Sequence, residues 1–129
     1  MIALDTNVLV RYLVEDDVRQ SAAAVRFIER AGAPLFVTQI VMCELVWVLS
    51  FAYDVPRREI VSLLHQLRRA ANLVIESADQ VQRAIDSYGV QRGDFADYLI
   101  AERAQASGCT AIATFDRALL ADQRFLAVP

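Results

Sequence analysis

Short apolar stretches alternate with longer segments of helical periodicity along the whole chain. The apolar stretches are rich in aliphatic and β-branched residues and lie at Ile2–Leu4, Leu35–Val37, Leu73–Ile75, Ala111–Thr114 and, more weakly, Phe125–Val128. Runs of this length and composition are typical of buried strands. Strands that alternate with helices in this way form βα units on a parallel sheet. The pattern therefore predicts an α/β fold with a parallel sheet of about five strands.

Residues that favour helix ends set the limits of the predicted helices. Thr38 and Asp94 are placed to cap two helix N-termini, and Ser77 with Gln80 matches the S-x-x-Q capping box. Gly108 stands where a left-handed residue is expected to end the last helix. The predicted helices begin just after residues 5–7 and then cover about 19–31, 39–53, 56–69, 77–88 and 94–107.

The length and hydrophobicity of the chain suit one globular domain. No repeat or linker divides its 129 residues, so we expect a single domain over 1–129. Although 56% of the residues are hydrophobic, no apolar run approaches the ~18 residues of a membrane span. We therefore expect no membrane segment and assign the apolar surplus to an interface. The first residues lack the basic and apolar regions of a signal peptide, which favours a cytoplasmic protein.

The reactive side chains of the sequence exclude several chemistries. Cys43 and Cys109 lie far apart in apolar surroundings, which predicts buried free thiols rather than a disulfide or a zinc site. His65 is the only histidine, so catalysis by Ser-His or Cys-His pairs lacks its usual base. All 13 basic residues are arginine, and the net charge is −3. A surface that is positive throughout is therefore not expected, although local arginines could contact phosphates.

Five acidic residues stand where the fold would not by itself require them. Asp5 ends the first strand, Asp116 ends the fourth, Glu44 interrupts an apolar helix, and Asp94 and Asp97 open the last helix. Ligand sites of open parallel sheets lie beyond the carboxyl ends of strands, at the point where strand order reverses. If strands one and four are neighbours there, carboxylates from both strand ends and two helices share one pocket. Each pair at ~4 Å would repel by about 4 kcal/mol, so the cluster needs a cation or protons.

Oxygen ligands without thiolate or imidazole favour Mg²⁺ or Mn²⁺, which often bridge to substrate phosphates. A metal-activated water could then hydrolyse a phosphodiester bond. Each acid also has a structural interpretation. Asp5, Asp94, Asp97 and Asp116 could be helix caps, and a core-facing Glu44 could pair with an arginine.

Four motifs in order give the chain a resemblance to a known family. They are Asp-Thr-Asn after the first strand, a glutamate in the helix after strand two, D-F-A-D-Y-L-I-A at the start of the last helix, and A-T-F-D at the end of strand four. Together they resemble a PIN domain, specifically a VapC-type toxin, over the whole chain. The resemblance implies a three-layer α/β/α sandwich, a metal-dependent endoribonuclease of a type II toxin-antitoxin system, an RNA substrate, a homodimer and a cognate antitoxin.

The resemblance also implies roles for individual residues. The metal-binding and catalytic acids fall on Asp5, Glu44, Asp97 and Asp116, with Mg²⁺ or Mn²⁺ as cofactor. Asp94 is an alternative third ligand, and the number of metal ions stays open. Hydrogen bonds that orient the carboxylates or a water are expected from Thr6, Asn7 and Thr114. Arginines near the acidic segments could bind RNA phosphates or equally pair with carboxylates, and they are Arg11, Arg92 and Arg117.

Other protein classes fit the sequence less well. Receiver domains of response regulators share the βα plan and an acidic Mg²⁺ pocket, but they need a lysine, and this chain has none. Haloacid-dehalogenase-type phosphatases need D-x-D at the first strand, where this chain has Asp5-Thr6-Asn7. A catalytically inactive PIN-like binding module is the main alternative. Trp47 and Phe51, one helical turn apart, are expected in the core or, as the alternative, in a groove for an antitoxin helix.

Overall fold

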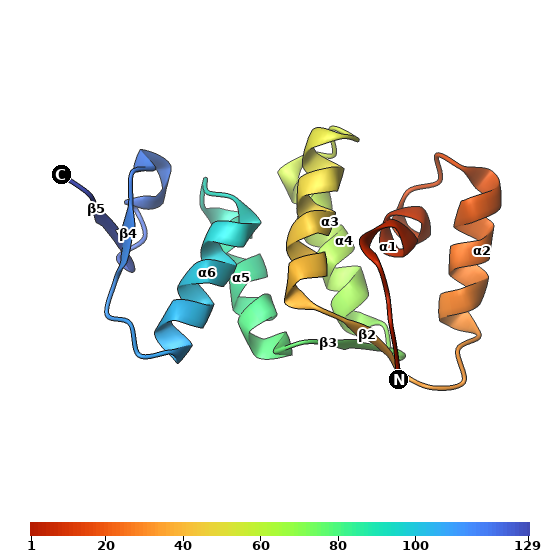
Figure 1. Ribbon diagram of the computed structural model, residues 1–129. Coiled ribbons are helices and arrows are strands. Elements are labelled where there is room, and N and C mark those ends of the chain that lie inside the picture. The colour runs from red at the N-terminus through yellow and green to blue at the C-terminus, as the bar shows by residue number, and fades with distance from the viewer. The chain divides into compact units, whose positions relative to one another are not determined.

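The computed structural model describes all residues of the chain, Met1–Pro129. The chain forms two compact units, Met1–Ala78 and Asp79–Pro129, and each is considered by itself. The first unit contains β1 (Ile2–Ala3), α1 (Thr6–Leu13), α2 (Val18–Glu29), β2 (Leu35–Val37), α3 (Gln39–Phe51), α4 (Arg57–Arg69) and β3 (Leu73–Ile75) (Figure 1). The second contains α5 (Ala78–Val90) from its second residue on, α6 (Phe95–Ala106), β4 (Ile112–Thr114), the 3₁₀ turn η1 (Arg117–Leu119) and β5 (Phe125–Ala127).

The first unit is a parallel sheet in the order β1-β2-β3 with two helices in each connection. In the register, Leu35 of β2 lies between Ile2 of β1 and Leu73 of β3. Helix α1 packs against α2 and α3, and α4 packs against α3 and β3. Buried aliphatic side chains such as Leu9 and Leu49 fill the space between these elements. The start of α1 is thereby held close to α3, which carries Glu44.

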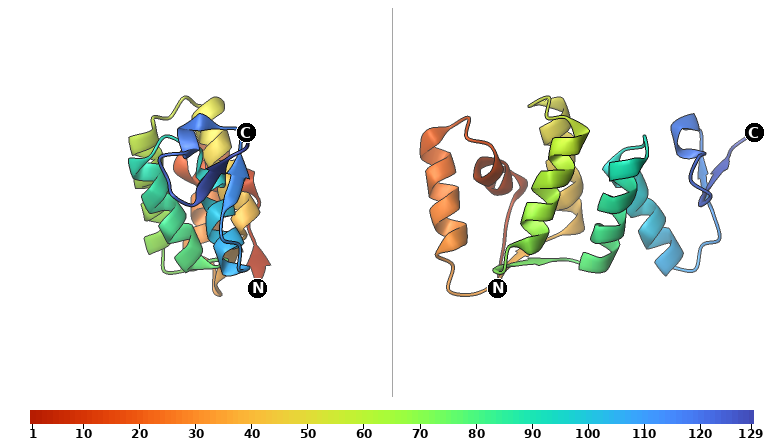
Figure 2. Two further views of the ribbon diagram at one scale, coloured as in Figure 1. Left: turned by 90° about the vertical axis from the view of Figure 1, so that its left-hand side faces the viewer. Right: turned by 180° about the vertical axis from the view of Figure 1, so that it is seen from behind.

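The second unit pairs α5 with α6, side by side in both views of Figure 2, and adds the parallel pair β4-β5. Helix α6 ends as the sequence predicts, because Gly108 has φ +89°. The amide of Gly108 donates a 3.0 Å hydrogen bond to the carbonyl of Gln105, and the amide of Cys109 donates one of 3.0 Å to the carbonyl of Ala104. This is the Schellman arrangement, which turns the chain toward β4.

Two aromatic residues form the centre of the second unit. Tyr98 of α6 is fully buried, and its ring meets that of Phe125 edge-on at 6.5 Å. The Tyr98 hydroxyl accepts a 2.8 Å hydrogen bond from the amide of Gly93. A Cβ at Gly93 would collide with the buried side chain of Leu119 and lie 2.8 Å from the Tyr98 hydroxyl, so close packing favours glycine at this position. Helix α6 is thereby fixed both to the loop before it and to β5 after it.

The predicted α/β class with parallel strands is confirmed, since all five strands are present and every pairing is parallel. They form a three-stranded sheet in the first unit and a two-stranded sheet in the second. That strand one neighbours strand four, and that 1–129 is a single domain, stay predictions. None of the helices combines the length and the hydrophobicity that crossing a bilayer requires.

Some local predictions are wrong. Both cysteines are free, but Cys109 is exposed, because it follows the glycine that ends α6, and Cys43 is half-buried. Trp47 and Phe51 are not in the core, because α3 buries the opposite face with Leu45 and Leu49. Their side chains are 61% and 66% exposed, with ring centroids 5.4 Å apart.

Candidate active site

Asp5, two residues after strand β1 ends, caps helix α1. Asp5 has the extended conformation of an N-cap residue, with φ −80° and ψ 158°. Its Oδ1 accepts a 2.8 Å hydrogen bond from the amide of Thr6, and its carbonyl accepts another from Val8. The Asp5 side chain is exposed. A carboxylate is therefore held in a defined position at the carboxyl end of β1, with oxygen lone pairs still available.

Thr6 connects this strand end to α3. Its side chain is buried, and its hydroxyl donates a 3.2 Å hydrogen bond to Oε1 of Glu44. Glu44 is exposed although its neighbours Leu45 and Val46 are buried, so the carboxylate does not face the core. The supporting function of Thr6 at a metal site stays a prediction. In the first unit, the carboxylates of Asp5 and Glu44 thus each accept a hydrogen bond from Thr6.

The other predicted residues on α1 have different surroundings. Asn7 is exposed and lines a cavity of about 320 Å³ between α1 and α2, together with Phe27. Arg11 is held by Asp16 at 2.8 Å, Gln20 at 2.6 Å and the hydroxyl of Tyr53 at 3.0 Å. Of the two interpretations of Arg11, pairing with a carboxylate is the one found.

Tyr53 completes the ion pair of Arg11. Its hydroxyl donates a 2.7 Å hydrogen bond to Oδ2 of Asp16. This hydrogen bond and the charge of Arg11 lower the pKa of Asp16 below its ordinary value. The contacts join α1, the segment before α2 and the segment after α3, so Arg11 holds the helix that Asp5 caps.

In the second unit, Asp94 and Asp97 form a capping box at the start of α6. Asp97 Oδ2 accepts a 3.1 Å hydrogen bond from the amide of Asp94. Burial raises the pKa of Asp97 above its ordinary value, and the charges of Asp94 and Asp116 raise it further. The structural interpretation of Asp94 and Asp97 as caps is thus correct. At the same time, Asp97 is a partly desolvated carboxylate under the influence of two others.

Asp116 follows β4 and begins η1. Its Oδ1 accepts a 2.9 Å hydrogen bond from the amide of Ala118, and its own amide donates one of 2.9 Å to the Thr114 hydroxyl. Thr114 therefore orients the backbone that carries Asp116, and its predicted contact with a carboxylate or a water stays a prediction. Asp116 itself is exposed.

The structure groups the predicted acids by unit. Asp5 and Glu44 share Thr6 in the first unit, whereas Asp94, Asp97 and Asp116 interact electrostatically in the second. No three His, Cys, Asp or Glu side chains meet in a group that could hold a metal ion. The convergence of acids from both units stays a prediction.

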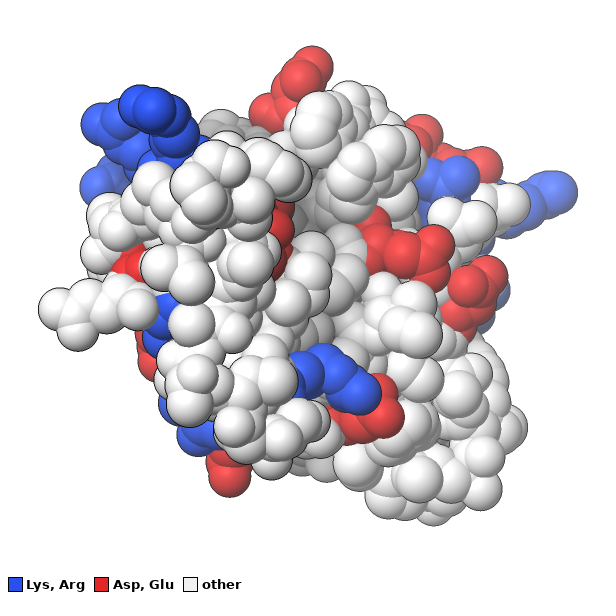
Figure 3. Space-filling model, turned by 60° about the vertical axis from the view of Figure 1, so that its left-hand side comes forward, with Lys and Arg blue, Asp and Glu red and all other residues white.

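The salt bridges of the structure use other carboxylates, those of Asp16, Glu102 and Asp122. Arg92 and Arg117, the remaining predicted RNA contacts, are both exposed. Acidic and basic side chains occur together on the face drawn in Figure 3, with uncharged surface between them. On that face, arginines are local features rather than a continuous basic surface.

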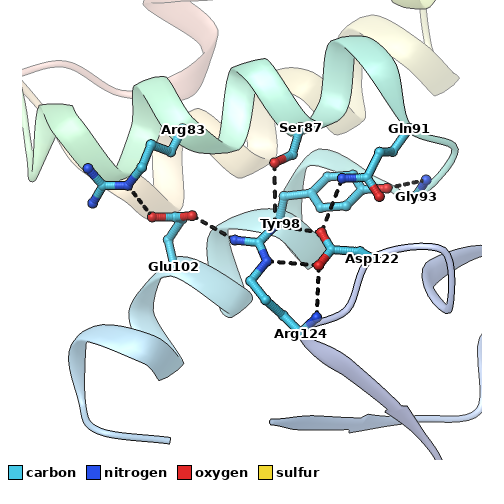
Figure 4. Close-up of polar contacts among 8 residues, drawn as sticks. All are labelled: Arg83, Ser87, Gln91, Gly93, Tyr98, Glu102, Asp122 and Arg124. Carbon is cyan, nitrogen blue, oxygen red and sulfur yellow. Dashed lines mark hydrogen bonds and ion pairs between the residues drawn. The ribbon is translucent and has the colours of Figure 1, made fainter. Parts of the chain in front are cut away.

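The second unit also contains a charged network that was not predicted from the sequence, drawn in Figure 4. It joins α5, α6 and the segment before β5 through Arg83, Ser87, Gln91, Glu102, Asp122 and Arg124. A signal for it was present, because Glu102 lies on the helical face that also buries Phe95, Tyr98 and Leu99. A glutamate on an apolar face requires a cationic partner.

Carboxylates at the carboxyl ends of parallel strands define a class of α/β protein that is suited to hard divalent cations. The family model described as PIN domain matches residues 2–125, and the chain belongs to this family. The predicted PIN resemblance is therefore confirmed.

Two further proteins are similar to the chain. A VapC ribonuclease from Aquifex aeolicus (strain VF5) is 28% identical over 119 residues, which cover 91% of this chain and 88% of that protein. The crystal structure of Mycobacterium tuberculosis VapC20, a sarcin-ricin loop cleaving toxin, matches with 15% identity and a TM-score of 0.48. That match covers 95% of each chain.

Proposed function

We propose that the protein is a metal-dependent endoribonuclease of the VapC type, the toxin of a type II toxin-antitoxin system. One observation carries the proposal: a chain of the PIN domain family has carboxylates at two strand ends and on two helices, outside its salt bridges. The similarity to a VapC ribonuclease supports RNA as the substrate. An RNA, a cognate antitoxin and a second copy of the chain are then its partners.

The donor set fits a hard divalent cation. In the proposal, Asp5 and Glu44 of the first unit and Asp97 and Asp116 of the second hold Mg²⁺ or Mn²⁺. All four offer only oxygen, which these ions prefer. Burial, and after it the charges of Asp94 and Asp116, raise the pKa of Asp97, and a nearby cation would stabilise the charged form of this carboxylate. When bound, the ion supplies Lewis-acid chemistry at the phosphate and makes a coordinated water more acidic.

The remaining residues orient these groups. The hydroxyl of Thr6 fixes one oxygen of Glu44 and leaves the other free. Thr114 fixes the turn of Asp116. Asp94, which shares the capping box with Asp97, orients that carboxylate rather than supplying a ligand. Arg92 and Arg117 are proposed to contact RNA phosphates, whereas Arg11 supports α1 through its contacts with Asp16 and Tyr53.

Cleavage of structured RNA tests the proposal. The wild-type protein should cleave with Mn²⁺ or Mg²⁺ present and stop when a chelator is added. Asp5→Asn should lose cleavage because a neutral amide binds these cations weakly. Asp54→Asn is the matched control, since Asp54 is exposed and has φ +50°, a conformation that asparagine also tolerates. Cleavage retained in Asp5→Asn would contradict the assignment, and RNA binding by the wild type without cleavage would favour an inactive binding module.

A further inference from the structure

Arg124 is the centre of the charged network in the second unit. Its Nε and Nη2 donate to the two oxygens of Asp122 at 3.0 and 2.7 Å, and its Nη1 donates to Glu102 Oε2 at 2.7 Å. A weaker contact of 3.3 Å joins Nη2 to the hydroxyl of Ser87 (Figure 4). One guanidinium therefore connects α5, α6 and the segment that precedes β5.

The carboxylate partners of Arg124 are buried, and their oxygens accept hydrogen bonds from several donors. Glu102 is 7% exposed and Asp122 is 9% exposed. Asp122 also accepts from Gln91 at 3.1 Å, and the second oxygen of Glu102 accepts from Arg83 at 2.5 Å. No buried side-chain polar atom lacks a hydrogen bond. A bidentate pair in such surroundings fixes relative positions more strictly than an exposed ion pair does.

Continuous hydrogen bonds lead from Arg124 to Asp116. The carbonyl of Arg124 accepts a 2.8 Å hydrogen bond from the amide of Ile112, the first residue of β4. Strand β4 then pairs with β5 up to Thr114, which holds the amide of Asp116. The position of the Asp116 carboxylate is thus tied to the backbone of Arg124.

A second path leads from Arg124 to Asp97. Glu102 and Asp97 lie five residues apart on the same helix, about 7.5 Å along its axis. Tyr98, next to Asp97, packs against Phe125, which follows Arg124 in the chain. The side chain of Arg124 therefore holds α6, while its backbone holds β4.

The Asp122–Arg124 pair is charged at neutral pH. Hydrogen bonding to Arg124 lowers the pKa of Asp122 to about 2. Asp122 therefore keeps its charge, and its two contacts with the guanidinium, at neutral pH.

We propose that Arg124 is a positioning residue, which sets the distance between Asp97 and Asp116 by joining α6 to the β4-β5 pair. This inference rests on the proposed function, in which both carboxylates bind the divalent cation. Arg124 itself touches neither carboxylate in its hydrogen bonds, so its effect is indirect. Residues that orient ligands in this way typically contribute about 10- to 100-fold to metal affinity or activity.

The test compares Arg124→Met with Arg83→Met. Arg83 also binds Glu102 but is 59% exposed, and its salt bridge reaches only α6, not β4 or β5. The dissociation constant for Mn²⁺ is measured from the electron paramagnetic resonance signal of the free ion, well below the melting temperature of each variant. Arg124→Met should weaken Mn²⁺ binding at least about tenfold, and Arg83→Met should change it less than about twofold.

The kinetics give a second readout. In Arg124→Met at fixed Mn²⁺, kcat for RNA cleavage should fall while KM for RNA stays near the wild-type value, because the RNA contacts are unchanged. A purely structural function of Arg124 would lower the melting temperature and leave the Mn²⁺ affinity of the folded protein unaltered. That result would overturn the inference.

A second variant keeps the test decisive. If Arg124→Met does not fold, the triple variant Arg124→Met, Glu102→Gln, Asp122→Asn removes the buried charges together and should still bind Mn²⁺ weakly. Wild-type affinity in the triple variant would overturn the inference. Failure of the proposed function looks different, because the wild-type protein itself would then neither bind Mn²⁺ nor cleave RNA.

Discussion

Two arginines, one in each unit, join several segments of the chain, but they differ in burial. The side chains of Arg11 and Asp16 in the first unit are 27% and 40% exposed. In the second unit, the side chain of Arg124 is 18% exposed, and those of its partners Glu102 and Asp122 are each 7% exposed. The hydrogen-bond distances are similar in the two units, so burial is the main difference.

This difference decides how much each network constrains the fold. Exposed ion pairs contribute little to the stability of the fold because water competes for both charges. Buried charges have lost their hydration, so each must keep its partners or the fold is destabilised. The second unit therefore depends on its network more strongly than the first, and it is also the unit in which Asp97 and Asp116 interact.

The largest effect is expected from Arg124→Met. This change leaves Glu102 and Asp122 buried with too few cationic partners, and breaking such a pair typically costs about 3–5 kcal/mol. Urea denaturation should show this decrease in the free energy of unfolding. A decrease below about 1 kcal/mol, the range of exposed pairs, would show that the burial difference between the two networks has no energetic consequence.

A smaller effect on the free energy of unfolding is expected when the pH is lowered. The pKa of Asp122 is lowered to about 2 in the folded state, so its ionised form stabilises the fold above the unfolded pKa near 3.8. This stabilisation, about 1–2 kcal/mol, is lost as the pH falls from about 4 to 2. Asp122→Asn should be less stable than the wild type at pH 7, and the difference should shrink over that range. A difference that does not change with pH would contradict the folded-state ionisation of Asp122.

The smallest effect is expected from Arg11→Met. Arg11 and Asp16 remain in contact with water, so the loss of their pair should shift the urea midpoint far less than Arg124→Met does. Tyr53→Phe, which removes the hydroxyl between them, should behave similarly. Equal shifts for Arg11→Met and Arg124→Met would contradict the comparison.

Several local features were predicted correctly because their signals lie in a few adjacent residues. The strand positions, the N-caps Thr38 and Asp94, and the glycine that ends α6 each depend on a few adjacent residues. The helix ends were less exact: α2, predicted over 19–31, is Val18–Glu29. Ser77 also departs from the expected cap geometry, since its φ of +48° is not extended.

Features that depend on packing between distant segments were not predictable in the same way. Helical periodicity places Glu102 on the buried face of α6, but its pairing with Arg124 depends on how α5, α6 and β5 meet, which no periodicity encodes. The exposure of Trp47 depends on which face of the apolar helix α3 turns inward. For the site, the sequence identified Asp5 and Asp97 through motifs, and their joint function stays a prediction.

In the proposed function, acids of both units bind Mg²⁺ or Mn²⁺, and Mn²⁺-dependent thermal stability tests this proposal most directly. Mn²⁺ should raise the melting temperature of the wild type, because a ligand that binds the folded state stabilises it. The shift should be largely lost in both Asp5→Asn and Asp97→Asn and kept in the control Asp54→Asn. A full shift in either Asp5→Asn or Asp97→Asn would contradict a site that needs both units.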